Sequence, residues 1–206
     1  MEHYIASLSA GTERTHVRYR NRFGITLAGD LYVSKEADRT KRLPAVVIGA
    51  PYGGVKEQGP CVYADELAKR GFVALTFDPS FNGESEGEPR HTSSPEIFSE
   101  DFSAGVDFLG TLGFVDREKI AALGICGSGG FAISAAQTDK RIRAVVTASM
   151  YDISRVQARG WEDGMTAFER SAALDALAAR RWKDVDEGAP EYIPTFPEAP
   201  YGEVPA

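Results

Sequence analysis

The sequence predicts an α/β fold, with a doubly wound, mostly parallel sheet and helices on both faces. Three observations support this class: several short apolar runs suited to buried strands, helical spacing of apolar residues between those runs, and a length of 206 residues. Strands that alternate with helices favour parallel pairing through right-handed crossovers. Two cysteines are too few for a disulfide framework, so the core must depend on hydrophobic burial.

An antiparallel hairpin is expected to precede the parallel strands. Residues 15–19 and 25–33 alternate apolar and polar side chains on either side of the turn-like residues 21–24. Residues 44–49 then form a short continuous apolar run, which is typical of a strand buried on both faces.

The remaining elements of the predicted sheet domain follow in alternation. They are a helix at 62–70 that ends at Gly71, a strand at 72–77, a helix at 97–112 that starts at Ser94 and Pro95, a strand at 119–125, a small-residue helix at 127–138 and a strand at 143–148. We predict a core over residues 1–155. Residues 156–206 are predicted to form a lid-like segment with a helix at 166–182 and a Pro-rich tail from Gly188.

Charge and hydropathy exclude several kinds of partner. The formal net charge of -7 argues against nucleic acid, whose phosphates attract clustered Lys and Arg. The N-terminal residues lack the apolar region of a signal peptide, and no stretch approaches the ~20 apolar residues of a membrane span. We therefore expect a cytoplasmic protein that binds neither nucleic acid nor membrane.

The strand predicted at 119–125 runs into a Gly-rich helix start with no intervening loop. This junction places Cys126 in a sharp turn at the carboxyl edge of the sheet, as in a nucleophile elbow, with Gly124 and Gly127 leaving room for the bend. The helix N-terminus favours a thiolate there and offers the amide of Gly127 to an oxyanion. An alternative assignment makes Ser128 the nucleophile.

A second Gly-rich loop, residues 49–58, follows the first buried strand. In folds with a nucleophile elbow, the loop at this place donates the second oxyanion amide. The amide of Tyr52 or of Gly53 is the candidate, because the glycines allow a substrate carbonyl to approach the backbone closely.

Residues 50–58, 78–87 and 124–130, taken in this order, resemble the α/β-hydrolase superfamily, specifically its dienelactone-hydrolase-like branch with Cys at the elbow. The resemblance implies a Cys, Asp and His triad, an acyl-enzyme and a small ester or lactone substrate, with no metal and no organic cofactor. The loop after the second buried strand is mainly structural in such proteins, which assigns Asp78, Gly83 and Ser85 to loop shape.

The sequence departs from that family where the triad should be completed. The acid and the base follow the nucleophile in α/β-hydrolases, whereas His3, His16 and His91 all precede Cys126. Three explanations remain open: a piece of a longer hydrolase, a catalytically incomplete module that binds or assembles, or a hydrolase with an improvised base. His91 is the candidate for that base, because its loop leaves the same sheet edge.

The predicted sheet also lacks the two strands that would follow residue 148 in this family, so we expect the α/β-hydrolase-like fold to be C-terminally incomplete. The strand at 143–148 would be an apolar edge, and proteins usually cover or pair such edges. We expect the helix at 166–182 and the tail to cover it, or two chains to pair there as a homo-oligomer. The predicted function is hydrolysis of a carboxylic ester or lactone by Cys126; the alternative is the incomplete binding or assembly module.

Overall fold

The computed structural model describes residues 4–192 of the chain. The chain divides into two compact units, Met1–Asp152 and Ile153–Ala206. The first unit holds the sheet and the second is helical. No helix within residues 4–192 has the length and apolar character needed to cross a membrane.

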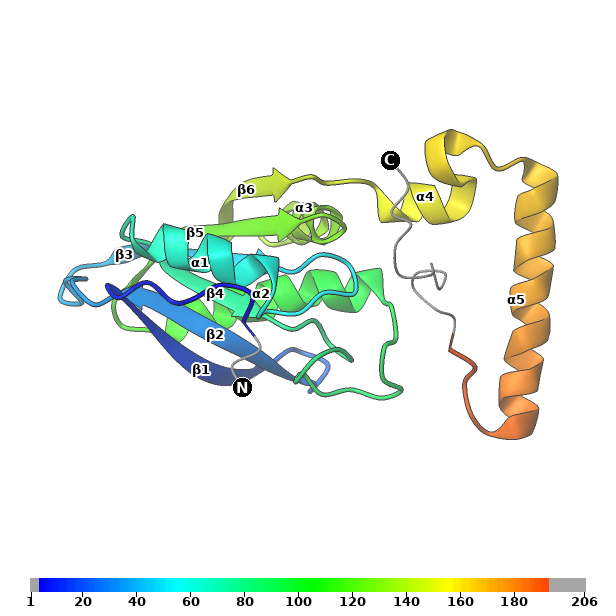
Figure 1. Ribbon diagram of the computed structural model, residues 1–206, viewed down its shortest axis with the longest axis horizontal. Helices are drawn as coiled ribbons and strands as arrows, with labels where there is room; N and C mark the ends of the chain where they lie inside the picture. The colour runs from blue at the N-terminus through cyan, green and yellow to red at the C-terminus, as the bar shows by residue number, and fades with distance from the viewer. Residues whose placement is uncertain (1–3, 193–206) are drawn as a thin grey trace. The chain divides into compact units, whose positions relative to one another are not determined.

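The first unit is a six-stranded sheet with three helices (Figure 1). Its elements are β1 (Thr12–Arg20), β2 (Thr26–Ser34), β3 (Leu43–Gly49), α1 (Gly59–Ala68), β4 (Val73–Phe77), α2 (Pro95–Thr111), β5 (Val115–Ile125), α3 (Ser128–Thr138) and β6 (Ile142–Ala148). The strand order is β1-β2-β4-β3-β5-β6. β3 pairs in parallel with β4 and β5, and β5 with β6, whereas β1 and β2 form the predicted hairpin and β2 is antiparallel to β4. The predicted α/β fold is confirmed.

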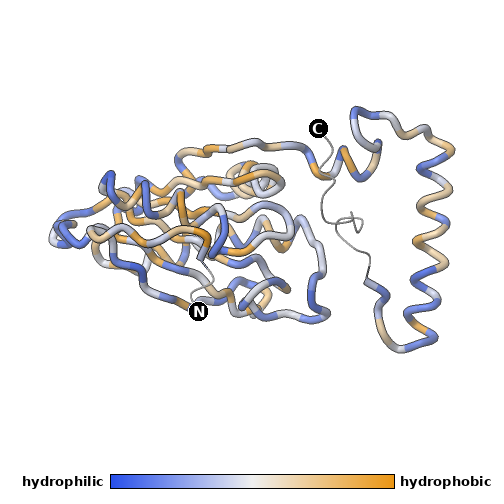
Figure 2. Tube along the Cα trace, in the orientation of Figure 1, coloured by the Kyte–Doolittle hydropathy of each residue, from blue (hydrophilic) through white to orange (hydrophobic). Residues whose placement is uncertain are grey.

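Helices cover both faces of this sheet. α1 lies over one face and α2 and α3 over the other (Figure 1). Between α1 and the sheet is a cluster of buried side chains, to which the helix contributes Cys61, Ala64 and Ala68 and the strands contribute Tyr32, Val46, Ile48, Ala74 and Leu123. On the opposite face Phe102 of α2 packs edge-to-face on Phe77, with ring centroids 5.2 Å apart. Hydrophobic residues gather in the middle of the sheet (Figure 2), as expected for β3 and β4, whose residues are mostly buried.

A buried polar network ties the hairpin turn to α2. Asp101 of α2 accepts hydrogen bonds from Asn21 Nδ2 at 2.9 Å and from the backbone N–H and hydroxyl of Ser80, both at 2.8 Å. Burial raises the pKa of Asp101 to about 6, although these hydrogen bonds act to lower it. The network connects three segments that are distant in the sequence.

Element boundaries differ from the predicted ones at several places. β1 begins at Thr12 rather than at residue 15, and the last helix ends at Glu187 rather than at residue 182. α1 begins at Gly59 rather than at residue 62, because Pro60 fits the first turn of a helix. β5 begins at Val115 rather than at residue 119, and its polar first half pairs only at Val115, with Leu43 of β3. Pairing with a neighbouring strand thus extends an element that the apolar pattern alone would shorten.

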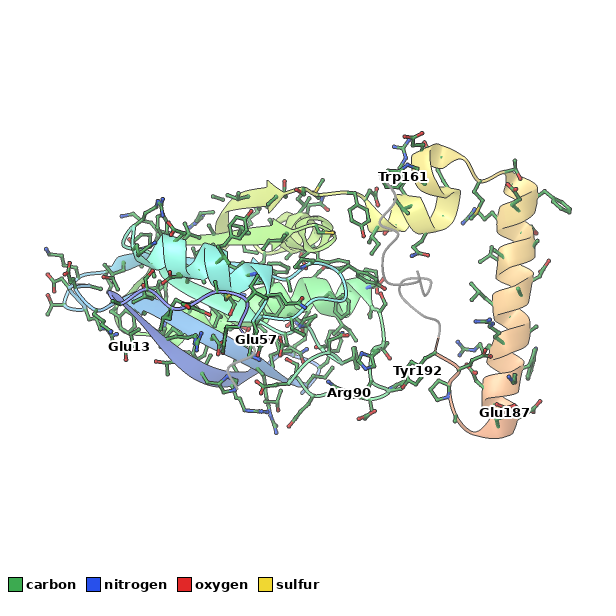
Figure 3. The ribbon with its side chains drawn as sticks, in the orientation of Figure 1. Glu13, Glu57, Arg90, Trp161, Glu187 and Tyr192 are labelled. Carbon is green, nitrogen blue, oxygen red and sulfur yellow. The ribbon has the colours of Figure 1, made fainter. Side chains whose placement is uncertain are left out.

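The second unit contains α4 (Ile153–Arg159), a 3₁₀ helix (Trp161–Asp163) and α5 (Ala167–Glu187). α5 begins at a capping box: the hydroxyl of Thr166 accepts from the N–H of Glu169, whose carboxylate accepts from the N–H of Thr166. None of the residues of α4 or α5 is buried. Trp161 and Glu187, labelled in Figure 3, are both exposed. The Pro-rich tail lies mostly outside the described residues, at 193–206.

β6 is the last strand in the sheet order, and among residues 4–192 no strand pairs with its outer side. Its residues from Arg143 to Thr147 are exposed, and Val146 is 51% exposed. An unpaired apolar strand of this kind is a site for further pairing. Its cover by a second copy of the chain remains a prediction.

Candidate active site

Cys126 occupies the bend between β5 and α3. Its φ is +56°, a left-handed conformation that is uncommon outside glycine and costs about 1–3 kcal/mol. The N–H of Cys126 donates to the carbonyl oxygen of Ala148 at 2.8 Å, which fixes the bend to the end of β6. The side chain is half-buried. The sharp bend that the sequence predicts at Cys126 is thus present, and its backbone is strained.

Gly124 permits the close packing of β5 against the start of α3. A Cβ atom at this position would lie 2.3 Å from the carbonyl oxygen of Ser128 and 2.5 Å from the nitrogen of Gly129. Both are backbone atoms, so no side-chain movement could relieve the clash. Gly127 precedes the first residue of α3, at the end where backbone N–H groups lack partners within a helix.

The loop after β3 reaches the same edge of the sheet. β3 and β5 are parallel neighbours, and Gly49 pairs with Gly124 at their carboxyl ends. The loop begins with a turn in which the N–H of Gly54 donates to the carbonyl of Pro51 at 2.7 Å, with Gly53 at a φ of +78°. Tyr52, at the tip of this turn, is half-buried. The topology therefore places the predicted oxyanion loop beside the elbow.

Ser128 joins the loop to the elbow. This residue begins α3 and is 8% exposed, and its hydroxyl donates to the carbonyl oxygen of Ala50. Because the Ser128 hydroxyl donates to a buried carbonyl, its role in the structure is to connect α3 to the loop after β3.

Tyr151 is a site residue that sequence analysis missed. It follows β6, and its phenol lies beside the side chain of Cys126. Burial raises the pKa of Tyr151, and the neighbouring Cys126 and Tyr52 raise it further, so the phenol stays protonated at neutral pH. The one sequence signal that could have indicated Tyr151 is its position just after β6. β6 is a parallel neighbour of β5, and the carboxyl ends of adjacent parallel strands lie at the same edge of a sheet.

The histidines lie on different elements. His91 is exposed in the loop between β4 and α2, with a φ of +60° and its backbone N–H bonded to the carbonyl of Phe81 at 2.9 Å. His16 lies on β1, with Nδ1 3.1 Å from a carboxylate oxygen of Asp30. His3 is outside the described residues. A base role for His91 remains a prediction.

A buried lysine lies close to the candidate oxyanion loop. The ammonium of Lys56 donates to Asp78 at 3.0 Å, to Glu84 at 2.7 Å and to Glu57. The side chains of Lys56 and Asp78 are 1% and 0% exposed. The carboxylates of Glu57, Asp78 and Glu84 are close enough together to hold a metal ion, but the ammonium that bonds all three supplies the cation of this cluster.

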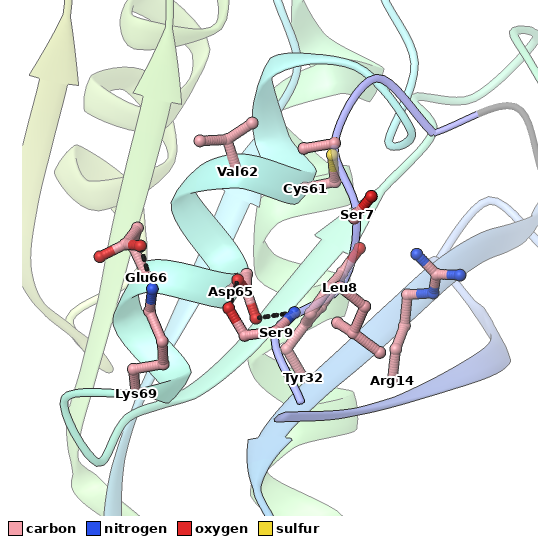
Figure 4. Close-up of a pocket in the computed structure, with 11 residues that line it drawn as sticks. Ser7, Leu8, Ser9, Arg14, Tyr32, Cys61, Val62, Asp65, Glu66 and Lys69 are labelled. Atoms are coloured by element: carbon pink, nitrogen blue, oxygen red, sulfur yellow. Dashed lines mark hydrogen bonds and ion pairs between the residues drawn. The ribbon is translucent and has the colours of Figure 1, made fainter. Parts of the chain in front are cut away.

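The other cysteine, Cys61, is in a separate place. It lines a cavity of about 250 Å³ between the N-terminal segment, α1 and β2 (Figure 4). This cavity is lined by Ala6, Ser7, Leu8, Ser9, Arg14, Tyr32, Cys61, Val62, Asp65, Glu66 and Lys69. Burial raises the pKa of the Cys61 thiol, and only 4% of the residue is exposed. A buried thiol of this kind is a poor nucleophile.

Comparison with known proteins identifies the family. A family model described as X-Pro dipeptidyl-peptidase (S15 family) matches residues 24–192. Protein PA2218 of Pseudomonas aeruginosa is 51% identical over 196 residues, which are 95% of this chain and 53% of that protein. A thiohydrolase of Aspergillus aculeatus, aneE, is 39% identical over 124 residues, which are 60% of this chain and 37% of that protein.

Solved structures agree with the fold. The crystal structure of PA2218 has a TM-score of 0.94 at 49% identity, and the match covers 99% of this chain and 63% of that one. A dienelactone hydrolase-like phosphotriesterase, P91, from metagenomic libraries has a TM-score of 0.59 at 18% identity, covering 84% of this chain and 79% of that one. The predicted α/β-hydrolase resemblance is confirmed. The chain spans about half the length of the curated relatives it matches most extensively.

Proposed function

Because this chain belongs to the X-Pro dipeptidyl-peptidase (S15) family of α/β-hydrolase fold, we propose that it hydrolyses a carboxylic ester or lactone, with Cys126 as nucleophile. The observation that carries the proposal is the left-handed bend at Cys126, with φ of +56°, between a buried strand and a helix N-terminus. Strain that the surrounding structure maintains at one reactive side chain is typical of an active site.

In the proposed reaction the Cys126 thiolate attacks the acyl carbon and forms a C–S bond. Negative charge develops on the carbonyl oxygen, which the N–H of Gly127 and the N–H of Tyr52 or Gly53 hold. The C–O bond then breaks, and the alcohol leaves with a proton from the solvent. Water hydrolyses the resulting thioester to the acid and restores Cys126.

Two features favour an ester over an amide substrate. An alcohol is a better leaving group than an amine, so its departure depends less on proton donation. Three relatives carry the name thiohydrolase, and two others are named acyltransferase and polyketide transferase. These names are compatible with an acyl group held on the enzyme.

Turnover of short-chain p-nitrophenyl esters by the 206-residue chain tests the proposal. We expect Cys126→Ala to abolish turnover and Cys61→Ala, at the other cysteine, to leave it unchanged. Turnover that persists in Cys126→Ala would refute the proposal.

The second candidate function is a module that binds or assembles without turnover. The unpaired edge of β6 favours it, because a further strand or chain can pair there. Stoichiometric labelling of Cys126 by an ester with no second turnover would support this function, whereas multiple turnovers by purified chain would exclude it.

A further inference from the structure

The geometry points to Lys56 as the positioning residue of the turn at 51–54, which carries the proposed oxyanion amides. This inference rests on the proposed function. Lys56 lies two residues after the turn, and both its backbone and its side chain bind one carboxylate: the N–H donates to Asp78 Oδ1 at 2.8 Å and the ammonium to Asp78 Oδ2 at 3.0 Å. Lys56 therefore holds the loop after β3 to Asp78 through two hydrogen bonds, one from its backbone and one from its side chain.

Asp78 is a fixed anchor for this fastening. It directly follows β4, which pairs in parallel with β3, and is fully buried. Its Oδ2 also accepts from the N–H of Glu84 at 2.9 Å. A Cβ atom at Gly83 would lie only 2.4 Å from the same oxygen, so the backbone of this loop packs directly on the carboxylate.

The charges of the cluster make the ammonium necessary. Three carboxylates, from Glu57, Asp78 and Glu84, surround one buried cation. Burial raises the pKa of Asp78, and Lys56 and two backbone N–H groups counter that effect. Without the ammonium, a buried carboxylate would lose its cation, and the loops on either side would have to move to admit water.

This movement would affect catalysis more than substrate affinity. Oxyanion donors act on charge that develops in the transition state, and they need placement within about 0.5 Å. A displaced turn at 51–54 is therefore expected to lower kcat and to leave KM nearly unchanged.

Three variants of the full chain test the inference. Lys56→Met removes the ammonium. Glu84→Gln removes one carboxylate of the cluster, and because this side chain is 56% exposed, we expect the variant to fold even if Lys56→Met does not. Lys69→Met is the matched control, at an exposed lysine paired with Glu66 on α1. The measurements are amide hydrogen exchange of residues 50–56, the single-turnover rate of acylation by p-nitrophenyl acetate, and the rate at which iodoacetamide alkylates Cys126.

In Lys56→Met we expect amide exchange in residues 50–56 to rise about tenfold and acylation to fall about 10²-fold, as when one oxyanion donor is lost. The rate of alkylation of Cys126 by iodoacetamide should not change, because this reaction forms no oxyanion. Glu84→Gln should shift exchange and acylation in the same directions by less, and Lys69→Met should match the wild type.

Unchanged exchange at residues 50–56 in both cluster variants would overturn the inference. An equal loss of alkylation and acylation would also overturn it, because the elbow itself would then be disturbed. If exchange rises in the variants but the wild type shows no acylation of Cys126, the proposed function fails while Lys56 remains the anchor of the loop.

Discussion

The hydroxyl of Ser128 donates a hydrogen bond to the carbonyl oxygen of Ala50, and both residues are buried. This bond joins the first residue of α3 to the first residue after β3. Since the candidate nucleophile elbow is at one end of the bond and the candidate oxyanion loop at the other, Ser128 holds the two halves of the proposed site together.

Replacement of Ser128 by Ala should weaken that tie without removing the nucleophile. A buried carbonyl left without its donor costs about 1–3 kcal/mol, which urea unfolding would measure. We expect the acyl adduct to form more slowly and still on Cys126. Loss of the adduct while iodoacetamide still labels Cys126 would instead make Ser128 the nucleophile.

Two glycines at the elbow should respond to Ala in opposite ways. Gly124→Ala places a Cβ atom 2.3 Å from the backbone oxygen of Ser128, and we expect a loss of about 3 kcal/mol or more. Gly130→Ala meets nothing within 4 Å inside α3 and should stabilise the chain by about 0.5–1 kcal/mol. Chemical denaturation compares the two, and equal effects would contradict the packing at Gly124.

Tyr151→Phe removes the phenol that lies beside Cys126. Because the raised pKa of Tyr151 keeps the phenol protonated, it can donate a hydrogen bond to the sulfur, and its loss should disfavour the thiolate. We expect iodoacetamide to alkylate Cys126 more slowly at neutral pH in this variant than in the wild type. An equal rate would show that the phenol does not act on the thiolate.

Asp101 should make stability depend on pH below neutrality. Because burial raises its pKa from 3.8 to about 6, the folded chain retains a proton that the unfolded chain releases between these values. Its contribution to the free energy of unfolding therefore falls as pH rises through this window, by at most about 1.4 kcal/mol per pH unit. The difference in unfolding free energy between wild type and Asp101→Asn should show this fall; a difference independent of pH would contradict it.

The exposed edge of β6 should promote self-association. Val145 and Val146 are 36% and 51% exposed on this strand. Light scattering should find a mass that increases with concentration, and Val146→Lys should reduce it, because lysine on an edge strand opposes pairing. A monomer at every concentration would contradict pairing through this edge.

The fold could be predicted because its signals are local. Residues 44–49 form a continuous apolar run, residues 72–77 are apolar except for Thr76, and Gly71 and Pro95 mark helix ends. The polar half of β5 and the short helix α4 lack such signals. β5 gains its first residues from pairing with β3 at Leu43.

The candidate site could be predicted only in part. Cys126 stands out because the strand, the bend and the helix are contiguous in the sequence. Tyr151 and Lys56 could not be found in this way, since each acts on a residue from another element; Lys56 and Asp78, for example, are 22 positions apart. Their contacts arise where the carboxyl ends of neighbouring strands meet, and no local pattern encodes that meeting.

Mass spectrometry of the chain quenched during reaction with p-nitrophenyl acetate tests the central claim most directly. We predict one acetyl group on the wild-type chain, mapped to Cys126 by peptide analysis, the same adduct on Cys61→Ala, and none on Cys126→Ala. An acetyl group that maps to another residue, or that persists in folded Cys126→Ala, would contradict the assignment of Cys126 as the nucleophile.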